Sequence, residues 1–145
     1  MGKYYEEFNV GDRFETHGRT LTDGDLSALN GLLWLTEPIH NDRPWATGQM
    51  GFKERLFPGV CILALGMGLL IRTGVLDDTV LLLLGINDVK FISPLFPGDT
   101  IRSTVEVVAK RESRSRPDAG IVTFKQTVRN HEDKAVSEYT ATLLV

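Results

Sequence analysis

The middle of the chain, residues 57–72, reads Phe57-Pro58-Gly59-Val60-Cys61-Ile62-Leu63-Ala64-Leu65-Gly66-Met67-Gly68-Leu69-Leu70-Ile71-Arg72. This run is apolar all round, which predicts a helix that is buried on every side. Pro58 suits the first turn of such a helix, and Gly74 is expected to cap its end. Gly66 and Gly68 each weaken a helix by roughly 1 kcal/mol relative to alanine. Their presence indicates that something packs closely against the helix backbone.

The residues after this helix have the period of β-strands. The predicted strands are residues 80–86 continuing into 88–92, then 100–108, 121–129 and 135–145. Short turns between successive strands favour an antiparallel meander. A sheet with one apolar face must cover that face, and the apolar helix can do so. The predicted fold class is therefore α+β, with a long central helix wrapped by a curved antiparallel β-sheet, the layout called a hot dog.

The residues before the helix contain one further element with a clear start. Thr22 is a good N-cap, and acidic residues follow it in the first turn of an amphipathic helix. Prolines and glycines then interrupt residues 36–58, so we expect an irregular segment there, of the kind that is often functional. The chain shows no repeat, linker or low-complexity tract. It is predicted to be a single domain over residues 1–145.

Composition excludes several classes of function. The net charge of −3, from 16 basic and 19 acidic residues, argues against nucleic acid as a partner. Three histidines and one cysteine provide no metal-binding spacing, and Cys61 alone predicts a reducing compartment without disulfides. The longest apolar run, residues 60–71, is too short to span a bilayer. We expect a cytoplasmic protein without a metal, nucleic-acid or membrane partner.

Six short motifs follow one another along nearly the whole chain. They are YEEFNVGD (residues 5–12), GRTLTDGD (18–25), EPIHND (37–42), FPGV (57–60), NDVKF (87–91) and SPLFPGDTI (93–101). In this order they resemble the MaoC-like dehydratase family and its (R)-specific enoyl-CoA hydratases. The resemblance implies the hot-dog fold. It also implies hydration of trans-2-enoyl thioesters to 3-hydroxyacyl thioesters, and the reverse dehydration.

The central motif of that family departs from its pattern here. The family places an aspartate five residues before a histidine that follows proline and an aliphatic residue. His40 stands at the histidine position, but the residue five before it is Leu35. Adding water needs one group to take a proton and one to give a proton, and leucine can do neither. The candidate catalytic residues are therefore His40 and Glu37, and we interpret Asp42 as structural. The other possibility is that only binding remains.

Other candidate residues each have a functional and a structural interpretation. The resemblance implies that Gly59 and Val60, at the helix start, offer N–H groups to the thioester oxygen, whereas glycine could equally serve close packing. Cys61 is interpreted as a small buried hydrophobe. Arg111 and Arg114 could bind the phosphates of coenzyme A or belong to a solvated hairpin loop.

Three aromatic side chains in or beside the irregular segment could wall an acyl pocket or pack the core. They are Trp34, Trp45 and Phe52. The sequence does not separate these two interpretations.

The sequence favours a hydratase or dehydratase of enoyl thioesters that needs no cofactor apart from the coenzyme A of its substrate. The alternative is a non-catalytic acyl-thioester-binding subunit of a hetero-oligomer. A thioesterase is a weaker hypothesis, because residues 60–71 contain no carboxylate. The expected ligand is an acyl-CoA or acyl-carrier thioester. A sheet too small to close on itself leaves an open edge, so we expect a homodimer or a higher oligomer of dimers.

Overall fold

The computed structural model describes all 145 residues. Its elements, in chain order, are a 3-10 turn Tyr5–Glu7, β1 (Arg13–Glu15), β2 (Arg19–Thr20), α1 (Asp23–Leu33), α2 (Pro38–Asn41), α3 (Arg43–Gly48), α4 (Gly59–Ile71), β3 (Leu82–Phe91), β4 (Thr100–Glu112), β5 (Gly120–Arg129) and β6 (Ala135–Leu144). None of these helices has the length and apolar character needed to cross a membrane.

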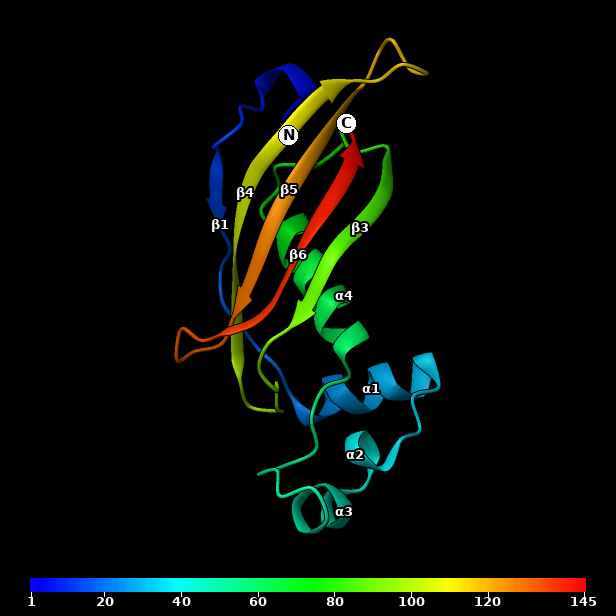
Figure 1. The fold of residues 1–145 in the computed structure, drawn as a ribbon, viewed down its shortest axis with the longest axis vertical. Coiled ribbons are helices and arrows are strands. Elements are labelled where there is room, and N and C mark those ends of the chain that lie inside the picture. The colour runs from blue at the N-terminus through cyan, green and yellow to red at the C-terminus, as the bar shows by residue number, and fades with distance from the viewer.

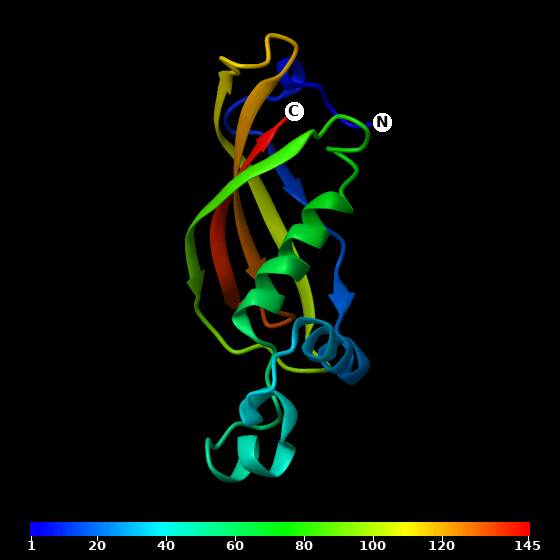
Figure 2. The same ribbon diagram turned by 90° about the vertical axis from the view of Figure 1, so that its right-hand side faces the viewer.

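The six strands form one antiparallel sheet in the order β1-β4-β5-β6-β3, with β2 pairing on β4. The sheet curves around α4, which runs along its concave face (Figure 1, Figure 2). Register shifts between Asn87 and Lys90 in β3, and between Val107 and Ala109 in β4, mark bulges of the kind that bend a sheet. The predicted α+β architecture, a long helix wrapped by a curved antiparallel sheet, is confirmed. The predicted meander holds only for β4, β5 and β6, because β3 pairs with β6 instead of with the next strand, β4.

A polar network lies between α4 and the sheet. The amide nitrogen of Gln126 donates to the carbonyl of Gly66 at 2.6 Å and to Ser103 Oγ at 2.9 Å. The hydroxyl of Tyr139 donates to Gln126 Oε1 at 2.9 Å, and burial raises the pKa of that hydroxyl. Because every one of these groups is shielded from water, the bonds specify how the helix sits on the sheet.

The two helix glycines turn out to differ. A Cβ on Gly66 would lie 2.6 Å from Tyr139 Oη and 2.9 Å from Val128 Cγ2, so the close packing predicted there is confirmed. A Cβ on Gly68 would meet nothing within 4 Å. The prediction was wrong for Gly68, which faces a surface groove instead of the sheet.

This difference predicts opposite effects of the same substitution. Gly66→Ala inserts a methyl group into a filled site and is expected to lower the free energy of unfolding by about 1–3 kcal/mol. Gly68→Ala places its methyl group in open space and is expected to raise it by roughly 0.5–1 kcal/mol, through reduced backbone entropy of the unfolded chain. Urea denaturation of the two variants measures both values. Equal shifts in the two variants would contradict the packing described here.

Three other expectations need correction. Residues 36–58 are not irregular throughout, because Pro38 and Pro44 each stand in the first turn of a short helix, where proline is tolerated. The central helix ends at Ile71 with Arg72 as its C-cap, and Gly74 lies beyond it at φ 76°. In the single chain the helix is not buried on every side. A stripe of exposed residues runs along it, made of Val60, Ala64, Gly68 and Ile71.

Candidate active site

His40 lies on α2, which together with α3 projects beyond the end of the sheet near the start of α4 (Figure 1, Figure 2). Its ring nitrogen Nδ1 is 2.7 Å from the carbonyl oxygen of Leu56. A carbonyl oxygen only accepts hydrogen bonds, so Nδ1 carries the proton of the neutral ring. The lone pair is then on Nε2, which makes His40 a proton acceptor held in one orientation.

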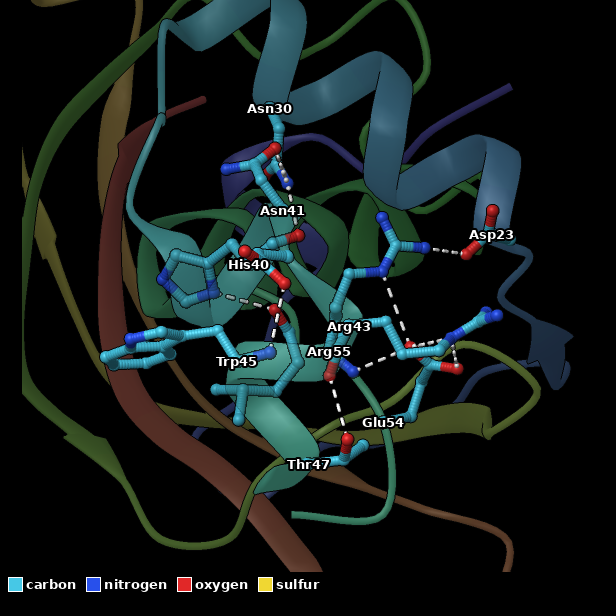
Figure 3. A network of polar contacts seen from close by, with 11 residues as sticks. Asp23, Asn30, His40, Asn41, Arg43, Trp45, Thr47, Glu54 and Arg55 are labelled. Atoms are coloured by element: carbon cyan, nitrogen blue, oxygen red, sulfur yellow. Dashed lines mark hydrogen bonds and ion pairs between the residues drawn. The ribbon is translucent and has the colours of Figure 1, made fainter. Parts of the chain in front are cut away.

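Two asparagines hold the backbone around His40 (Figure 3). Asn30 on α1 is nearly fully buried, and its amide nitrogen donates to the carbonyl of His40 at 3.1 Å. The amide of Asn41 donates to the carbonyls of Leu35, at 2.7 Å, and Glu37, at 3.0 Å. Sequence reasoning missed Asn30. A polar side chain on the apolar face of α1, four residues after Leu26, was the signal available.

No hydrogen bond or ion pair joins His40 to a carboxylate. Leu35 is half-buried and packs against the core. Glu37 is exposed, caps the start of α2 with its backbone, and its side chain makes no hydrogen bond there. Asp42 accepts the backbone N–H of Trp45 at 2.9 Å and so caps α3, which gives it the structural role expected from the sequence.

The first turn of α4 offers unpaired donors. The carbonyl of Pro58 accepts the N–H groups of Cys61, at 2.9 Å, and Ile62, at 3.1 Å. The N–H groups of Gly59 and Val60 bond no backbone carbonyl, as is general for the first residues of a helix. A Cβ on Gly59 would lie 2.8 Å from the ring of Phe91. Glycine is thus needed for packing, and it can also present its N–H to a ligand.

An apolar cavity of about 340 Å³ opens at this helix start. It is lined by Leu56, Phe57, Gly59, Ile62, Phe91, Ile92, Ser93 and Pro94. Leu56, whose carbonyl orients His40, and Gly59, which begins α4, therefore line the same cavity. Helix donors for a negative oxygen and a histidine with a free Nε2 are brought to the same end of the molecule.

The predicted phosphate-binding arginines are not brought to this end. Arg111 and Arg114 belong to the hairpin between β4 and β5, which lies at the opposite end of the sheet from α2 (Figure 1). Neither pairs with a carboxylate, whereas the neighbouring Arg116 makes two hydrogen bonds to Asp118, at 3.0 and 2.9 Å. Within one chain these arginines cannot act on a ligand held at His40.

The three aromatic candidates have different surroundings. Trp34 ends α1 in the left-handed conformation at φ 56°, and 87% of its surface is exposed, so it walls no pocket in the single chain. The indole of Trp45 points to the same side as the imidazole of His40 (Figure 3). The ring of Phe52 packs on Phe96, with ring centroids 6.3 Å apart.

Neither a reactive cysteine nor a metal site is found near His40. Cys61 is fully buried, and burial raises the pKa of its thiol, which disfavours the reactive thiolate. No three His, Cys, Asp or Glu side chains gather closely enough to hold a metal ion.

A known family matches this chain. The profile of the family described as MaoC like domain matches residues 10–130, and the chain belongs to this family. Protein MaoC of Klebsiella aerogenes is 33% identical over 111 residues, which are 77% of this chain and 32% of that protein. Mesaconyl-CoA hydratase of Haloarcula hispanica is 31% identical over 135 residues, 90% of this chain and 36% of that protein. The chain thus spans about a third of the length of both relatives.

Solved structures agree with this membership. The MaoC-like dehydratase from Rhodospirillum rubrum superposes with a TM-score of 0.86 at 28% identity, covering 99% of this chain and 97% of that one. A Mycobacterium tuberculosis protein described as having a double hotdog fold gives a TM-score of 0.79 at 22% identity, covering 99% of this chain and 44% of that one. The hot-dog fold and the family expected from the six motifs are therefore confirmed.

Proposed function

We propose that this chain is a hydratase or dehydratase of enoyl thioesters in which His40 moves the proton. The observation that carries the proposal is the 2.7 Å contact between His40 Nδ1 and the Leu56 carbonyl, which leaves Nε2 free as a proton acceptor. Leu56 also lines the cavity at the start of α4. Support also comes from the relative named mesaconyl-CoA hydratase. The reaction is cytoplasmic in this proposal and takes coenzyme A only as part of the substrate.

The chemistry follows from His40 and from the free N–H groups at the start of α4. Nε2 of His40 takes a proton from water while the water oxygen bonds to the β-carbon of the enoyl thioester. Electron density shifts to the thioester oxygen, which accepts hydrogen bonds from the N–H groups of Gly59 and Val60. The proton on Nε2 then passes to the α-carbon. Water has been added across the double bond, and the imidazole is neutral again.

One imidazole can serve both proton transfers in this scheme, which matches the lack of a carboxylate bonded to His40. Glu37 is the second candidate for the proton donor, since it lies three residues before His40 and its carboxylate is free. The substitution Glu37→Gln keeps the side-chain shape and removes the charge. A large fall in kcat with unchanged ligand binding would assign the acid to Glu37, and an unchanged kcat would assign both transfers to His40.

A dimer is the second part of the proposal. Strand β3 is an edge of the sheet, and its apolar side chains are about half-exposed: Leu82 59%, Leu83 50%, Leu84 48% and Phe91 50%. Long apolar edges pair with other strands unless a charge prevents it. Antiparallel pairing of two β3 edges would also bring the hairpin with Arg111 and Arg114 of a partner to the end that carries α2. In that arrangement these arginines could meet the phosphates of coenzyme A. The other arrangement expected from the sequence places two central helices side by side.

Sedimentation velocity at micromolar concentration tests this dimer. We expect a dimer for the wild type and a monomer for Leu83→Lys, because a lysine on the edge blocks strand pairing. The control is Val10→Lys, which changes an exposed apolar residue near β1, at the other edge of the sheet. A monomeric wild type would rule the dimer out.

The alternative function is binding without catalysis, and Leu35 at the family's aspartate position favours it. The substitution Leu35→Asp restores the family pattern, and hydration of crotonyl-CoA and mesaconyl-CoA measures the outcome. If the wild type is active and Leu35→Asp is slower, the site is built around Leu35 and the hydratase proposal stands. An inert wild type with an active Leu35→Asp variant would make this chain a binding subunit.

A further inference from the structure

Four charged side chains form a chain of contacts from α3 through residues 54 and 55 to α1 (Figure 3). Arg43 Nε, at the start of α3, is 3.0 and 2.8 Å from the two carboxylate oxygens of Glu54. Glu54 Oε1 also accepts a hydrogen bond from the backbone N–H of Arg55 at 2.8 Å. The Nε of Arg55 donates to the same oxygen at 3.4 Å. The guanidinium of Arg55 then bonds the carboxylate of Asp23, the first residue of α1. The starts of two helices are thereby tied to residues 54 and 55.

The inner members of this chain are shielded from solvent. The Arg55 side chain is 13% exposed and that of Glu54 is 21% exposed, against 62% for Arg43 and 60% for Asp23. Shielded ion pairs are screened less by salt and hold their geometry better than exposed pairs. The Arg43 guanidinium, with the backbone N–H of Arg55, lowers the pKa of Glu54 to about 2, so the carboxylate stays charged at neutral pH.

Arg55 directly precedes the residue that orients His40. The Leu56 carbonyl is the one hydrogen-bond partner of the His40 ring, at 2.7 Å. The N–H of Leu56 makes only a long bond, 3.4 Å, to the carbonyl of Ile39. The peptide unit that carries the Leu56 carbonyl is held on its far side, where the N–H of Phe57 donates to the carbonyl of Leu95 at 2.8 Å. Its near side follows Arg55, so the placement of this carbonyl against His40 depends on both anchors.

We propose that Arg55 and Glu54 are positioning residues for His40, holding the segment before the Leu56 carbonyl against α1 and α3 so that Nδ1 keeps the proton and Nε2 stays the acceptor. The Glu54 and Arg55 side chains bond Arg43 and Asp23 and make no bond to His40, so they act on the histidine through the Leu56 backbone. The effect on catalysis rests on the proposed function, whereas the effect on the histidine tautomer does not. A displacement of about 1 Å can slow a reaction by about 10²-fold, so a small turn of this peptide matters.

The experiment combines ¹⁵N NMR of labelled histidine, at a pH where the ring is neutral, with hydration of crotonyl-CoA. The variants are Glu54→Gln, Arg55→Met and Arg55→Lys. The control is Asp118→Asn, which breaks an exposed carboxylate–arginine pair at the far hairpin, where an arginine likewise lowers the pKa of the carboxyl to about 2. We expect Glu54→Gln and Arg55→Met to mix the two His40 tautomers and to lower kcat by about 10- to 100-fold with little change in KM.

Arg55→Lys keeps a cation for Asp23 and should recover part of the loss, while Asp118→Asn should change neither readout. An unchanged His40 tautomer in folded Glu54→Gln would overturn the proposal, whatever happens to the rate. If Arg55→Met fails to fold, Glu54→Gln decides, because it keeps the size and shape of the side chain. If the wild type shows no hydration and the His40 tautomers are mixed in Glu54→Gln, the positioning role is upheld and the hydratase function is rejected.

Discussion

Replacing His40 by alanine is expected to lower kcat for crotonyl-CoA hydration by about 10²- to 10⁴-fold, the usual cost of losing a positioned acid–base group. The physical reason is that His40 Nε2 is the group that takes the proton from water in the proposed reaction, and the bond from Nδ1 to the Leu56 carbonyl fixes its direction. The KM should change little, because the apolar lining and the α4 donors remain. Steady-state kinetics of the wild type and the variant measure both constants.

A matched control separates chemistry from general effects of losing a histidine. His17 is exposed between β1 and β2, and His17→Ala should leave kcat unchanged. Circular dichroism should show that His40→Ala keeps its fold, since the lost contact is one hydrogen bond, worth about 0.5–1.5 kcal/mol. A His40→Ala variant that retains hydratase activity within a few-fold would exclude His40 as the catalytic base.

Removing the N–H of Gly59 without breaking α4 is expected to lower kcat by about 10²- to 10³-fold, as for the loss of one oxyanion donor. Gly59→Pro does this, because proline is tolerated at the first position of a helix. Pro58 has φ −58° and ψ 145°, an extended conformation compatible with a following proline. The helix should therefore form normally.

Gly59→Ala is the control for this variant. Both substitutions add a Cβ that would lie 2.8 Å from the ring of Phe91, and that half-exposed ring can move away in both. Only proline also removes the N–H. The ratio of the two kcat values therefore reports the hydrogen bond itself, and a ratio near one would show that Gly59 is needed for packing alone.

Local pattern was sufficient for the main architecture. The apolar run of residues 57–72 predicted the central helix, and the alternating residues after residue 100 predicted the strands, although the burial of the helix on every side was wrong. The helix that begins after Thr22 was predicted from its N-cap, and the structure shows the capping box, with Asp25 bonding back to Thr22. The two short helices α2 and α3 were missed, because proline was interpreted as a breaker where it begins a helix.

The length of β4 explains why Arg111 and Arg114 are remote from His40. This strand has 13 residues, and a strand rises about 3.3 Å per residue, so its ends are roughly 40 Å apart. Strands β4, β5 and β6 form a meander, so the β4–β5 and β5–β6 hairpins lie at opposite ends of the sheet. The position of that basic hairpin could have been derived from the predicted strands. The exposed stripe on α4 could not, because it depends on which side of the helix packs against the sheet.

The sequence by itself determined the fold class, the family and the identity of His40 as the candidate base, because these depend on local period and on ordered motifs. Only the tertiary structure decided how His40 is held. Its partner is the backbone carbonyl of Leu56, 16 residues away. Every residue has a backbone carbonyl, so the sequence does not indicate which one a side chain will bond. Asn30 is similar, since its bond to the His40 carbonyl exists only where α1 and α2 meet. Long-range contacts between backbone and side chains depend on the packed chain as a whole.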